Sequence, residues 1–364
     1  MLMKHKILRN IIRCDLQKEL RIIFILLIIL CWSAPAKARE VKIATYNVQN
    51  LFDLTRDGTE YEEYIPEGPL GWNKRIADIK YRNIARVIKG LSPDIIALEE
   101  VESRRALISL RSAVQQKGLD YPYFEIAESK PSAVKCAVLS TFPIISKREI
   151  RVKNGARSIL MVKVDIDGKS LILFINHWKS KRGPESMRLP YAKALRREID
   201  KLSVGTDFIV LGDFNSNYNE YRTFRYKPLL NDTNGITGIN HILCTIKNGR
   251  LVTEKSLVAI RSNKYLYNLW LEIRPTRRWS YNLFGRKGTP DSIMVPWALY
   301  DDKGISYVDN SFDKFTPPYL FRNHALFQWQ RAEKGKGRHL GMGYSDHLPI
   351  FAWFSTEPFR LKRR

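Results

Sequence analysis

The stretch DFIVLGDFNS, residues 207–216, runs from an apolar segment into a Gly-Asp-Phe-Asn turn. Its apolar part has the length and the β-branched content of a buried strand. The strand therefore ends close to Asp213 and Asn215, where the chain opens into a loop. These two polar residues could simply form a turn of their own, or they could belong to a polar site. The ends of the other predicted strands distinguish between the two interpretations.

Further apolar runs with β-branched residues predict strands elsewhere in the chain. They cover residues 41–48, 94–101, 135–141, 158–166, 170–178, 291–296 and 348–354. Apolar residues at helical spacing predict helices over residues 73–90, 104–118 and 191–202. Many strands with a few helices among them indicate a layered α/β arrangement with mixed sheets. We expect residues 218–275 and 298–340 to be irregular, aromatic-rich surface loops.

Polar residues recur at the ends of these predicted strands. They are Asn47, Glu99, Glu100, His177, Asp291, Asp346 and His347, in addition to Asp213 and Asn215. Each has an ordinary explanation alone, but coincidence explains so many of them poorly. Carboxylate and amide oxygens are the ligands that Mg²⁺, Mn²⁺ or Ca²⁺ prefers, and two imidazoles could act as general base and general acid. Such a set suits metal-assisted attack of water on a phosphate ester.

The composition is that of a globular protein with a strong positive charge. The chain has 364 residues, of which 44% are hydrophobic and 27% charged, and its formal net charge is +24. Its length suits one large or two ordinary domains, and no repeat or low-complexity linker marks a boundary. A positive field of this size attracts polyanions, meaning nucleic acid or an anionic membrane.

The N-terminus has the pattern of a secretory signal peptide. Basic residues precede the eleven-residue apolar run IIFILLIILCW at 22–32, and SAPAKA follows, which predicts cleavage after Ala38. The run is shorter than the roughly 20 residues that a membrane span needs, so an uncleaved anchor is the alternative. We therefore expect residues 1–38 to be removed, leaving an exported periplasmic or extracellular protein without a stable membrane anchor. The removed segment carries seven basic and two acidic residues, so the remainder keeps a charge of +19.

Two cysteines, Cys136 and Cys244, remain after Ala38. Cys136 lies in an apolar run, where a free buried thiol is the favoured interpretation. A single disulfide between the two is the alternative, since an oxidising compartment permits it.

Seven motifs, read in order, resemble the endonuclease/exonuclease/phosphatase superfamily of DNase I-like enzymes. They are TYNVQNLFD, PDIIALEEVE, CAVLSTFPI, FINHWKS, VLGDFNS, TPDSIMV and YSDHLPI, within residues 41–356. GDFN together with SDHLPI is the most specific part. The resemblance implies a four-layer α/β sandwich, with two mixed β-sheets packed face to face and helices outside. We expect residues 39–364 to form a single such domain with a basic C-terminal tail, and to be a monomer.

The resemblance also implies roles for individual residues. It implies catalytic roles for His177, Asp213, Asp291 and His347, and metal binding by Asn47, Glu100 and Asp346, with Mg²⁺ as the expected ion and Mn²⁺ or Ca²⁺ as alternatives. Asn215 and Arg157 would orient phosphate or water. In this pattern Asp291 fixes the orientation of the His347 imidazole.

Two positions depart from the superfamily pattern. Glu99 stands where a glutamine usually precedes the metal-binding glutamate, and we expect it to add negative charge near the metal. Val134 and Lys135 stand where pancreatic-type DNases carry the glutamate that orients the second histidine. His177 therefore lacks an identified partner, and Glu125 and Glu128 are the candidates.

Nuclease activity on DNA, or on RNA, is the first hypothesis for the substrate. Basic and aromatic residues flank the motifs and could contact a phosphate backbone or bases: Lys179, Lys181, Arg182, Arg277, Arg278, Trp279, Arg286 and Lys287. The second hypothesis is a sphingomyelinase-like phospholipid phosphodiesterase. It would need an exposed hydrophobic hairpin, for which residues 317–321 and 297–300 are poor candidates. The third is a non-catalytic relative that binds polyanions.

Overall fold

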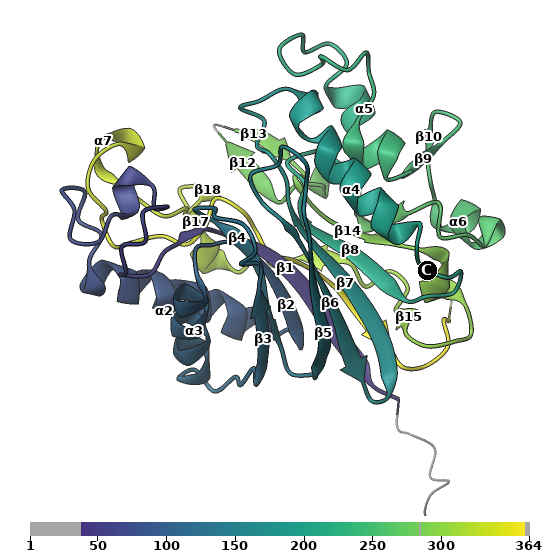
Figure 1. Cartoon of the computed structure of the whole chain (residues 1–364), viewed down its shortest axis with the longest axis horizontal. Coiled ribbons are helices and arrows are strands. Elements are labelled where there is room, and N and C mark those ends of the chain that lie inside the picture. Colours follow the sequence, from purple (N-terminus) through teal and green to yellow (C-terminus); the bar gives the residue numbers. More distant parts are fainter. Residues whose placement is uncertain (1–37, 284, 361–364) are drawn as a thin grey trace, which may run out of the picture. The chain divides into compact units, whose positions relative to one another are not determined.

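The computed structural model describes residues 38–283 and 285–360 (Figure 1). Within these ranges, the residues from Glu40 to Arg360 form one compact unit. The predicted signal peptide lies outside the described residues except for its last position. Within the described ranges, no helix combines the length and the apolar character needed to cross a membrane.

The first β-sheet has β1 (Glu40–Leu51) near its centre. In the described chain its order is β15 (Ser306–Tyr307), β19 (Ile350–Ser355), β1, β2 (Ile95–Val101), β4 (Lys135–Ser140) and β3 (Tyr123–Ile126), with β16 (Asp313–Lys314) also paired to β19. β1 and β2 run parallel, and the other pairs are antiparallel. The sheet is therefore mixed.

The second β-sheet is built around a parallel pair as well. Its order over the described residues is β11 (Tyr267–Asn268), β14 (Asp291–Val295), β8 (Phe208–Asp213), β7 (Lys169–His177), β6 (Ile159–Ile166) and β5 (Ile144–Ile150). Only β7 and β8 are parallel in this set. The two central parallel pairs, β1–β2 and β7–β8, end in the polar residues that the sequence singles out.

Helices cover the outer faces of both sheets (Figure 1). α2 (Lys74–Leu91) and α3 (Arg104–Gln115) pack on the first sheet, and α4 (Leu189–Ile199) packs on the second. Shorter elements decorate the edges: α5 (Glu220–Thr223), the π-helical turn η3 (Gly238–Ile242), α6 (Glu254–Ile260), α7 (Ala332–Gly335) and the hairpins β9–β10 (Ile246–Lys247, Arg250–Leu251), β12–β13 (Tyr281–Leu283, Arg286–Gly288) and β17–β18 (Phe321–Arg322, Ala325–Leu326).

Three hydrophobic clusters separate the layers. The cluster between the sheets contains buried residues of both, such as Ile43 and Leu211. A second lies between the first sheet and α2 and α3, and a third between the second sheet and α4. Successive side chains of a strand point to opposite faces of the sheet. One set therefore packs in the inter-sheet core and the other set packs beneath the helices. The predicted four-layer sandwich of two mixed sheets with outer helices is confirmed.

The predicted strands and helices occur with end shifts of a few residues, but two expectations were incomplete. β3 and β5 were missed because polar positions, such as Glu125 of β3 and Arg148 of β5, interrupt the apolar pattern. Residues 218–275 are not merely surface loops. They supply the fully buried Trp270 and Leu257 to the inter-sheet core, and residues 298–340, also expected to be surface loops, supply Leu299 and Tyr307 to it.

Both described cysteines are free thiols, with Cys136 buried and Cys244 partly exposed. The favoured interpretation of a buried Cys136 thiol is therefore confirmed, and the disulfide alternative is wrong for this structure.

The close approach of β7 and β8 depends on one glycine. Gly212 has a backbone φ of +127°, in the region that favours glycine, and a Cβ placed on it would lie 2.1 Å from the carbonyl oxygen of Asn176. The clash would be with main chain, which cannot move aside without separating the strands. Gly212 therefore sets the position of its neighbour Asp213.

We predict that Gly212→Ala lowers the free energy of unfolding by about 3 kcal/mol or more, combining backbone strain with overpacking. Gly168→Ala is the matched control, because Gly168 also has a positive φ, of +83°, but has nothing within 4 Å of its Cβ position. Urea unfolding would measure both changes. An equal loss in the two variants would show that the contact with Asn176 is unimportant.

Candidate active site

Strand register brings three of the predicted residues side by side on the second sheet. His177 at the end of β7 is the partner of Asp213 at the end of β8, and Asp213 is also the partner of Asp291 at the start of β14. All three side chains are buried. On the first sheet, Asn47 of β1 is the register partner of Glu99 of β2.

The backbone turns sharply where the first sheet reaches the site. Gln49, Asn50 and Glu100 have φ values of 51°, 61° and 67°, and the β1–β2 register shifts at this point. The backbone N–H of Asn50 donates to Glu100 Oε2 at 2.9 Å. Because of this irregularity, the Glu100 side chain departs from the alternating directions of the other β2 side chains. Bulges next to functional sites commonly redirect a side chain in this way.

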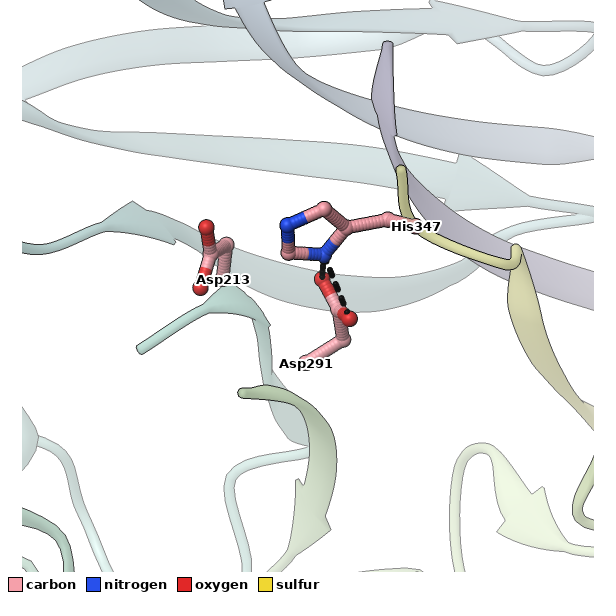
Figure 2. Close-up of side chains that lie close together, drawn as sticks. All are labelled: Asp213, Asp291 and His347. Atoms are coloured by element: carbon pink, nitrogen blue, oxygen red, sulfur yellow. Dashed lines mark hydrogen bonds and ion pairs between the residues drawn. The ribbon is translucent and has the colours of Figure 1, made fainter. Parts of the chain in front are cut away.

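Asp291 and His347 form the central contact of the site (Figure 2). His347 Nδ1 lies 2.8 Å from Asp291 Oδ2 and 3.0 Å from Oδ1, and Figure 2 shows the other ring nitrogen on the side of Asp213. The Ser280 hydroxyl donates to Asp291 Oδ2 at 2.5 Å. The Trp270 indole donates to the Asp291 carbonyl at 2.7 Å, which fixes the main chain. The ring orientation is thus set by the carboxylate.

Asp213 has amide partners from both sheets. Asn47 Nδ2 donates to its Oδ2 at 3.0 Å, and Asn215 Nδ2 donates to the same oxygen at 3.2 Å. The backbone N–H of Asn215 donates to Oδ1 at 2.8 Å. Asn215 also donates to the carbonyl of Trp178, so the GDFN turn is tied to the residue that follows His177.

His177 faces the carboxylates without forming a hydrogen bond to either. Its Nε2 lies 3.6 Å from Glu100 Oε1 and 3.7 Å from Asp213 Oδ2. Its Nδ1 has no hydrogen-bond partner among the residues described. Glu125 and Glu128, the candidate partners, are instead occupied by ion pairs with Arg104 and Lys147, so that suggestion is wrong.

The surroundings push the pKa values of the two histidines in opposite directions. Burial, together with the positive charges of Arg157 and His347, lowers the pKa of His177 well below its usual value. Burial alone would also lower the pKa of His347, but the charges of Asp291 and Asp346 and the hydrogen bond to Asp291 raise it well above that value. His177 is therefore neutral near pH 7, whereas His347 carries a proton on each ring nitrogen.

The carboxyl groups also depart from ordinary behaviour. Burial raises the pKa of Asp213 to about 7, against the opposing influence of the His347 charge. Burial and the charge of Asp346 raise the pKa of Glu100. Divergent pKa values among neighbouring groups are typical of sites that transfer protons.

Glu99 does not behave as its position in the sequence indicates. It is fully buried, and the Thr45 hydroxyl donates to its Oε1 at 2.7 Å. Burial raises its pKa well above the ordinary value, which favours the neutral carboxylic acid. Burial therefore opposes the negative charge that Glu99 is expected to add near the metal.

The donors in this region fit a hard divalent cation. Asp213, Asp291 and His347 each have a possible ligand atom within 4.8 Å of the others. Asp291 and His347 are already bonded to one another, however, and the carboxylates of Glu100 and Asp346 offer further oxygen atoms. Oxygen donors of this kind suit Mg²⁺, Mn²⁺ or Ca²⁺.

Arg157 and the basic residues after β7 lie beside the site. They differ in whether their side chains are already paired within the protein or are exposed. Arg157 Nη1 donates to the Trp178 carbonyl at 3.2 Å, and its charge influences both Glu100 and His177. Lys181 is paired with Glu220 at 2.6 Å, so its charge is partly used internally. Lys179 is half-buried and Arg182 is exposed.

The basic residues between positions 277 and 287 also include some that are paired within the protein and some that are exposed. Arg278 donates to two main-chain carbonyls and to the Tyr218 hydroxyl, so its guanidinium is committed to the fold. Arg277 is exposed and pairs loosely with Asp313 at 3.6 Å. Trp279 is half-buried, with the ammonium groups of Lys314 and Lys287 at 3.8 and 5.0 Å from its ring centroid. Lys287 and Arg286 are both exposed on the β12–β13 hairpin.

Two residues of the site were not identified from the sequence. The Tyr281 ring lies 4.8 Å from the His347 ring, and burial together with Asp346 raises the pKa of its hydroxyl to about 12. Ser280 holds Asp291, as described above. Both lie in RRWSYN, which was considered only for nucleic-acid contact, and no local pattern indicates the bridge between Tyr281 and His347.

A two-sheet sandwich with this polar site at one end defines the DNase I-like class of proteins. Residues 42–250 match the family described as the Endonuclease/Exonuclease/phosphatase family, which is more than half of the chain. The chain belongs to this family. No curated protein sequence matches it in a direct comparison.

Solved structures show the same fold. A humanized D. rerio TDP2 with 14 mutations is 14% identical, with a TM-score of 0.53, and the match covers 86% of this chain and 98% of that one. D. rerio TDP2 complexed with a single-strand DNA product is 14% identical over the same shares, with a TM-score of 0.52. TDP2 from C. elegans is 16% identical over 86% of this chain and 75% of that one, with a TM-score of 0.50.

We predict that Asp291→Asn lowers the pKa of His347 toward or below the ordinary value of about 6.5, because it removes the negative charge that outweighs burial. Nuclear magnetic resonance titration of the imidazole nitrogens in metal-free protein would measure the change. At pH 7 the wild-type ring is doubly protonated and the variant ring mostly neutral. Asp313→Asn is the control, since Asp313 pairs with Arg277 instead. An unchanged titration in Asp291→Asn would contradict the assignment.

Proposed function

We propose that this protein is a divalent-metal-dependent phosphodiesterase that hydrolyses the backbone of DNA, with RNA as the alternative nucleic acid. The contact between Asp291 and His347 is the observation that supports this proposal. The buried Asp291 carboxylate holds one ring nitrogen of His347, and the other ring nitrogen faces Asp213 (Figure 2). A purely binding protein does not require histidines and carboxylates with such divergent pKa values.

Glu100, Asp346 and Asn47 are the residues proposed to hold the metal, with Mg²⁺ as the expected ion. Asn47 Nδ2 donates to Asp213, so the side-chain oxygen Oδ1 of Asn47 is the atom that could bind the metal. That oxygen accepts from the Gln49 backbone at 3.0 Å and has a second lone pair. A bound divalent ion would neutralise charge on the phosphate during the reaction.

The pKa values divide the proton transfers between Asp213 and His347. Asp213, with a pKa of about 7, is suited to accept a proton from the attacking water. His347 is protonated and is suited to give a proton to the leaving oxygen. The water oxygen bonds to phosphorus as the ester bond breaks, and the proton on Asp213 can then return to His347.

His177 and Arg157 are proposed to position the phosphate. His177 is neutral, so it can donate a hydrogen bond but is a poor source of protons. Arg157 remains available as a charge beside the site, in the way that guanidinium groups commonly bind phosphate. Asn215 orients Asp213 through its amide and its backbone N–H.

The charge of the chain supports a nucleic-acid substrate. A net charge of +24 favours a polyanion, and the exposed Arg182, Arg286 and Lys287 follow site residues in the chain. The D. rerio TDP2 structure that holds a single-strand DNA product shares this fold. We further propose that the enzyme acts outside the cytoplasm, on the strength of the signal-peptide pattern in residues 1–38.

One observation favours a phospholipid as the second candidate substrate. Residues 317–321 and 297–300 are unsuited to membrane entry, since Leu320 and Leu299 are buried. Tyr226 and Leu229, however, are 84% and 91% exposed, and Arg225 and Lys227 lie beside them in the chain. Exposed apolar and basic residues together are typical of segments that contact anionic lipid surfaces.

We predict that the purified protein nicks plasmid DNA in Mg²⁺ and that EDTA abolishes this activity. Plasmid DNA, RNA and sphingomyelin would be compared under the same conditions by gel electrophoresis and by phosphocholine release. Hydrolysis of sphingomyelin with intact nucleic acid would replace the substrate while keeping the mechanism. No hydrolysis of the three would favour the polyanion-binding relative.

We predict that His347→Ala lowers the phosphodiesterase rate by about 10²–10⁴-fold, as expected for loss of a general acid or base. His324→Asn is the control, because His324 is exposed on the β17–β18 turn and asparagine tolerates its positive φ of 61°. Initial rates on plasmid DNA at equal protein concentration would measure both. Activity near wild type in His347→Ala would overturn its assigned role.

A further inference from the structure

A second cluster of carboxylates lies beside the end of β2, outside the site described above. Asp57 and Glu60 come from the loop after β1, and Glu102 follows β2 directly. Each has a possible ligand oxygen within 4.8 Å of the other two. Acidic clusters are common on protein surfaces, so this grouping alone indicates nothing.

Glu102 distinguishes this cluster from an ordinary acidic surface. The residue is only 1% exposed. Its Oε2 accepts the backbone N–H of Asp53 at 2.6 Å, but its Oε1 has no hydrogen-bond partner in the described part of the chain. Leaving a buried carboxylate oxygen unpaired costs more than a typical hydrogen bond contributes. The oxygen therefore calls for a partner that the protein itself does not supply.

The local charges leave room for a dication. Asp53 is already paired with Arg105 at 2.9 Å and accepts from Ser103, so it is accounted for. Lys135 is the ammonium that acts on Asp57 and Glu102, and its Nζ donates to the Glu102 carbonyl. Asp57 and Glu60 against one ammonium leave one negative charge, and burial raises the pKa of Glu102 to about 8, so a bound dication would displace the Glu102 proton and meet two negative charges.

The loop carboxylates are held in place by main chain and keep oxygen lone pairs free. Glu60 accepts from the backbone N–H groups of Asp57 and Gly58, the latter at 2.9 Å. Asp57 Oδ1 accepts both the N–H and the hydroxyl of Thr59, at 2.9 and 2.8 Å. A carboxylate has about four lone-pair directions, so these contacts orient the groups without filling them.

We propose that Asp57, Glu60 and Glu102 form a second divalent-cation site, with Ca²⁺ as its preferred ion. Ca²⁺ accepts several carboxylate oxygens in flexible geometry, whereas Mg²⁺ demands a near-octahedral shell and retains waters. Asp57 is exposed, so an ion can enter from solvent, and buried Glu102 would form the inner wall. The ion would join the loop at 52–61 to the end of β2.

This site would stabilise the segment that leads into the proposed active site. The loop begins just after Asn50, whose N–H holds Glu100. It is anchored at its start by the Trp72 indole, which donates to the Asp53 carbonyl at 2.9 Å. A cation between Asp57 and Glu102 would fix the other side of the loop, so its function is structural and independent of hydrolysis.

Calorimetric titration of metal-free protein with Ca²⁺, together with thermal unfolding, tests the proposal. We expect Ca²⁺ at a hundredfold excess over its Kd to raise the Tm by about 4 °C or more. Glu102→Gln and Asp57→Asn should each weaken Ca²⁺ binding at this site at least tenfold. Glu62→Gln is the matched control, since Glu62 is an exposed acid of the same segment outside the cluster, and it should bind as wild type does.

Glu100→Gln separates this site from the proposed catalytic metal. It should remove binding at the active site and leave the Ca²⁺-induced rise in Tm intact, even if the phosphodiesterase proposal fails. Terbium luminescence excited through Trp72 would locate the ion, and Glu102→Gln should abolish it. Asp57→Asn keeps the test decisive if Glu102→Gln does not fold, because Asp57 is exposed. Wild-type Ca²⁺ affinity in Asp57→Asn, or no effect of Ca²⁺ on the wild type, would overturn the proposal.

Discussion

Two polar contacts across the sandwich hold its site end together. His347 comes from the loop that leads into β19 of the first sheet, and Asp291 from β14 of the second. Asn47 of β1 and Asp213 of β8 make the other contact between the sheets. Buried charges and amides are costly unless they find partners, so these contacts are satisfied only when the two sheets align correctly at this end. The geometry of the site therefore depends on the packing of the two sheets, and correct packing at this end depends on the contacts of the site.

The same burial that makes these contacts necessary also makes the groups chemically different from one another. Asp213 and Glu99 are both acids in the inter-sheet region, and burial raises the pKa of each, to about 7 for Asp213 and well above the ordinary value for Glu99. His177 and His347 differ because only His347 has a carboxylate on its ring nitrogen. Position within one small buried region therefore assigns proton-donor and proton-acceptor character without any unusual residue type.

Local patterns in the sequence were sufficient for a layered α/β arrangement with mixed sheets and for residues at strand ends, such as Asp213 and His177, whereas the sandwich itself was expected from the family resemblance. They succeed because a buried strand has a recognisable apolar run and its end is visible as a change to polar residues. They fail where a role depends on distant partners. Tyr281 reaches the site through a backbone β-bridge to His347, and Glu125 forms ion pairs with Arg104 and Lys147. Neither pairing leaves a periodic trace, and nothing local to Glu99 reveals that burial will raise its pKa.

The chain order of the strands has a consequence for when the molecule can act. The second sheet is formed by strands from β5 to β14, whereas the first sheet begins with β1 and is completed by β19, with Glu40 paired to Ser355. His347 lies three residues before the start of β19, so its position depends on the pairing of that last strand of the first sheet. Such sequence-distant pairing forms slowly, after the local elements. A chain without a paired β19 would lack a correctly placed His347 beside Asp213, so the proposed proton transfer requires the first sheet to be complete.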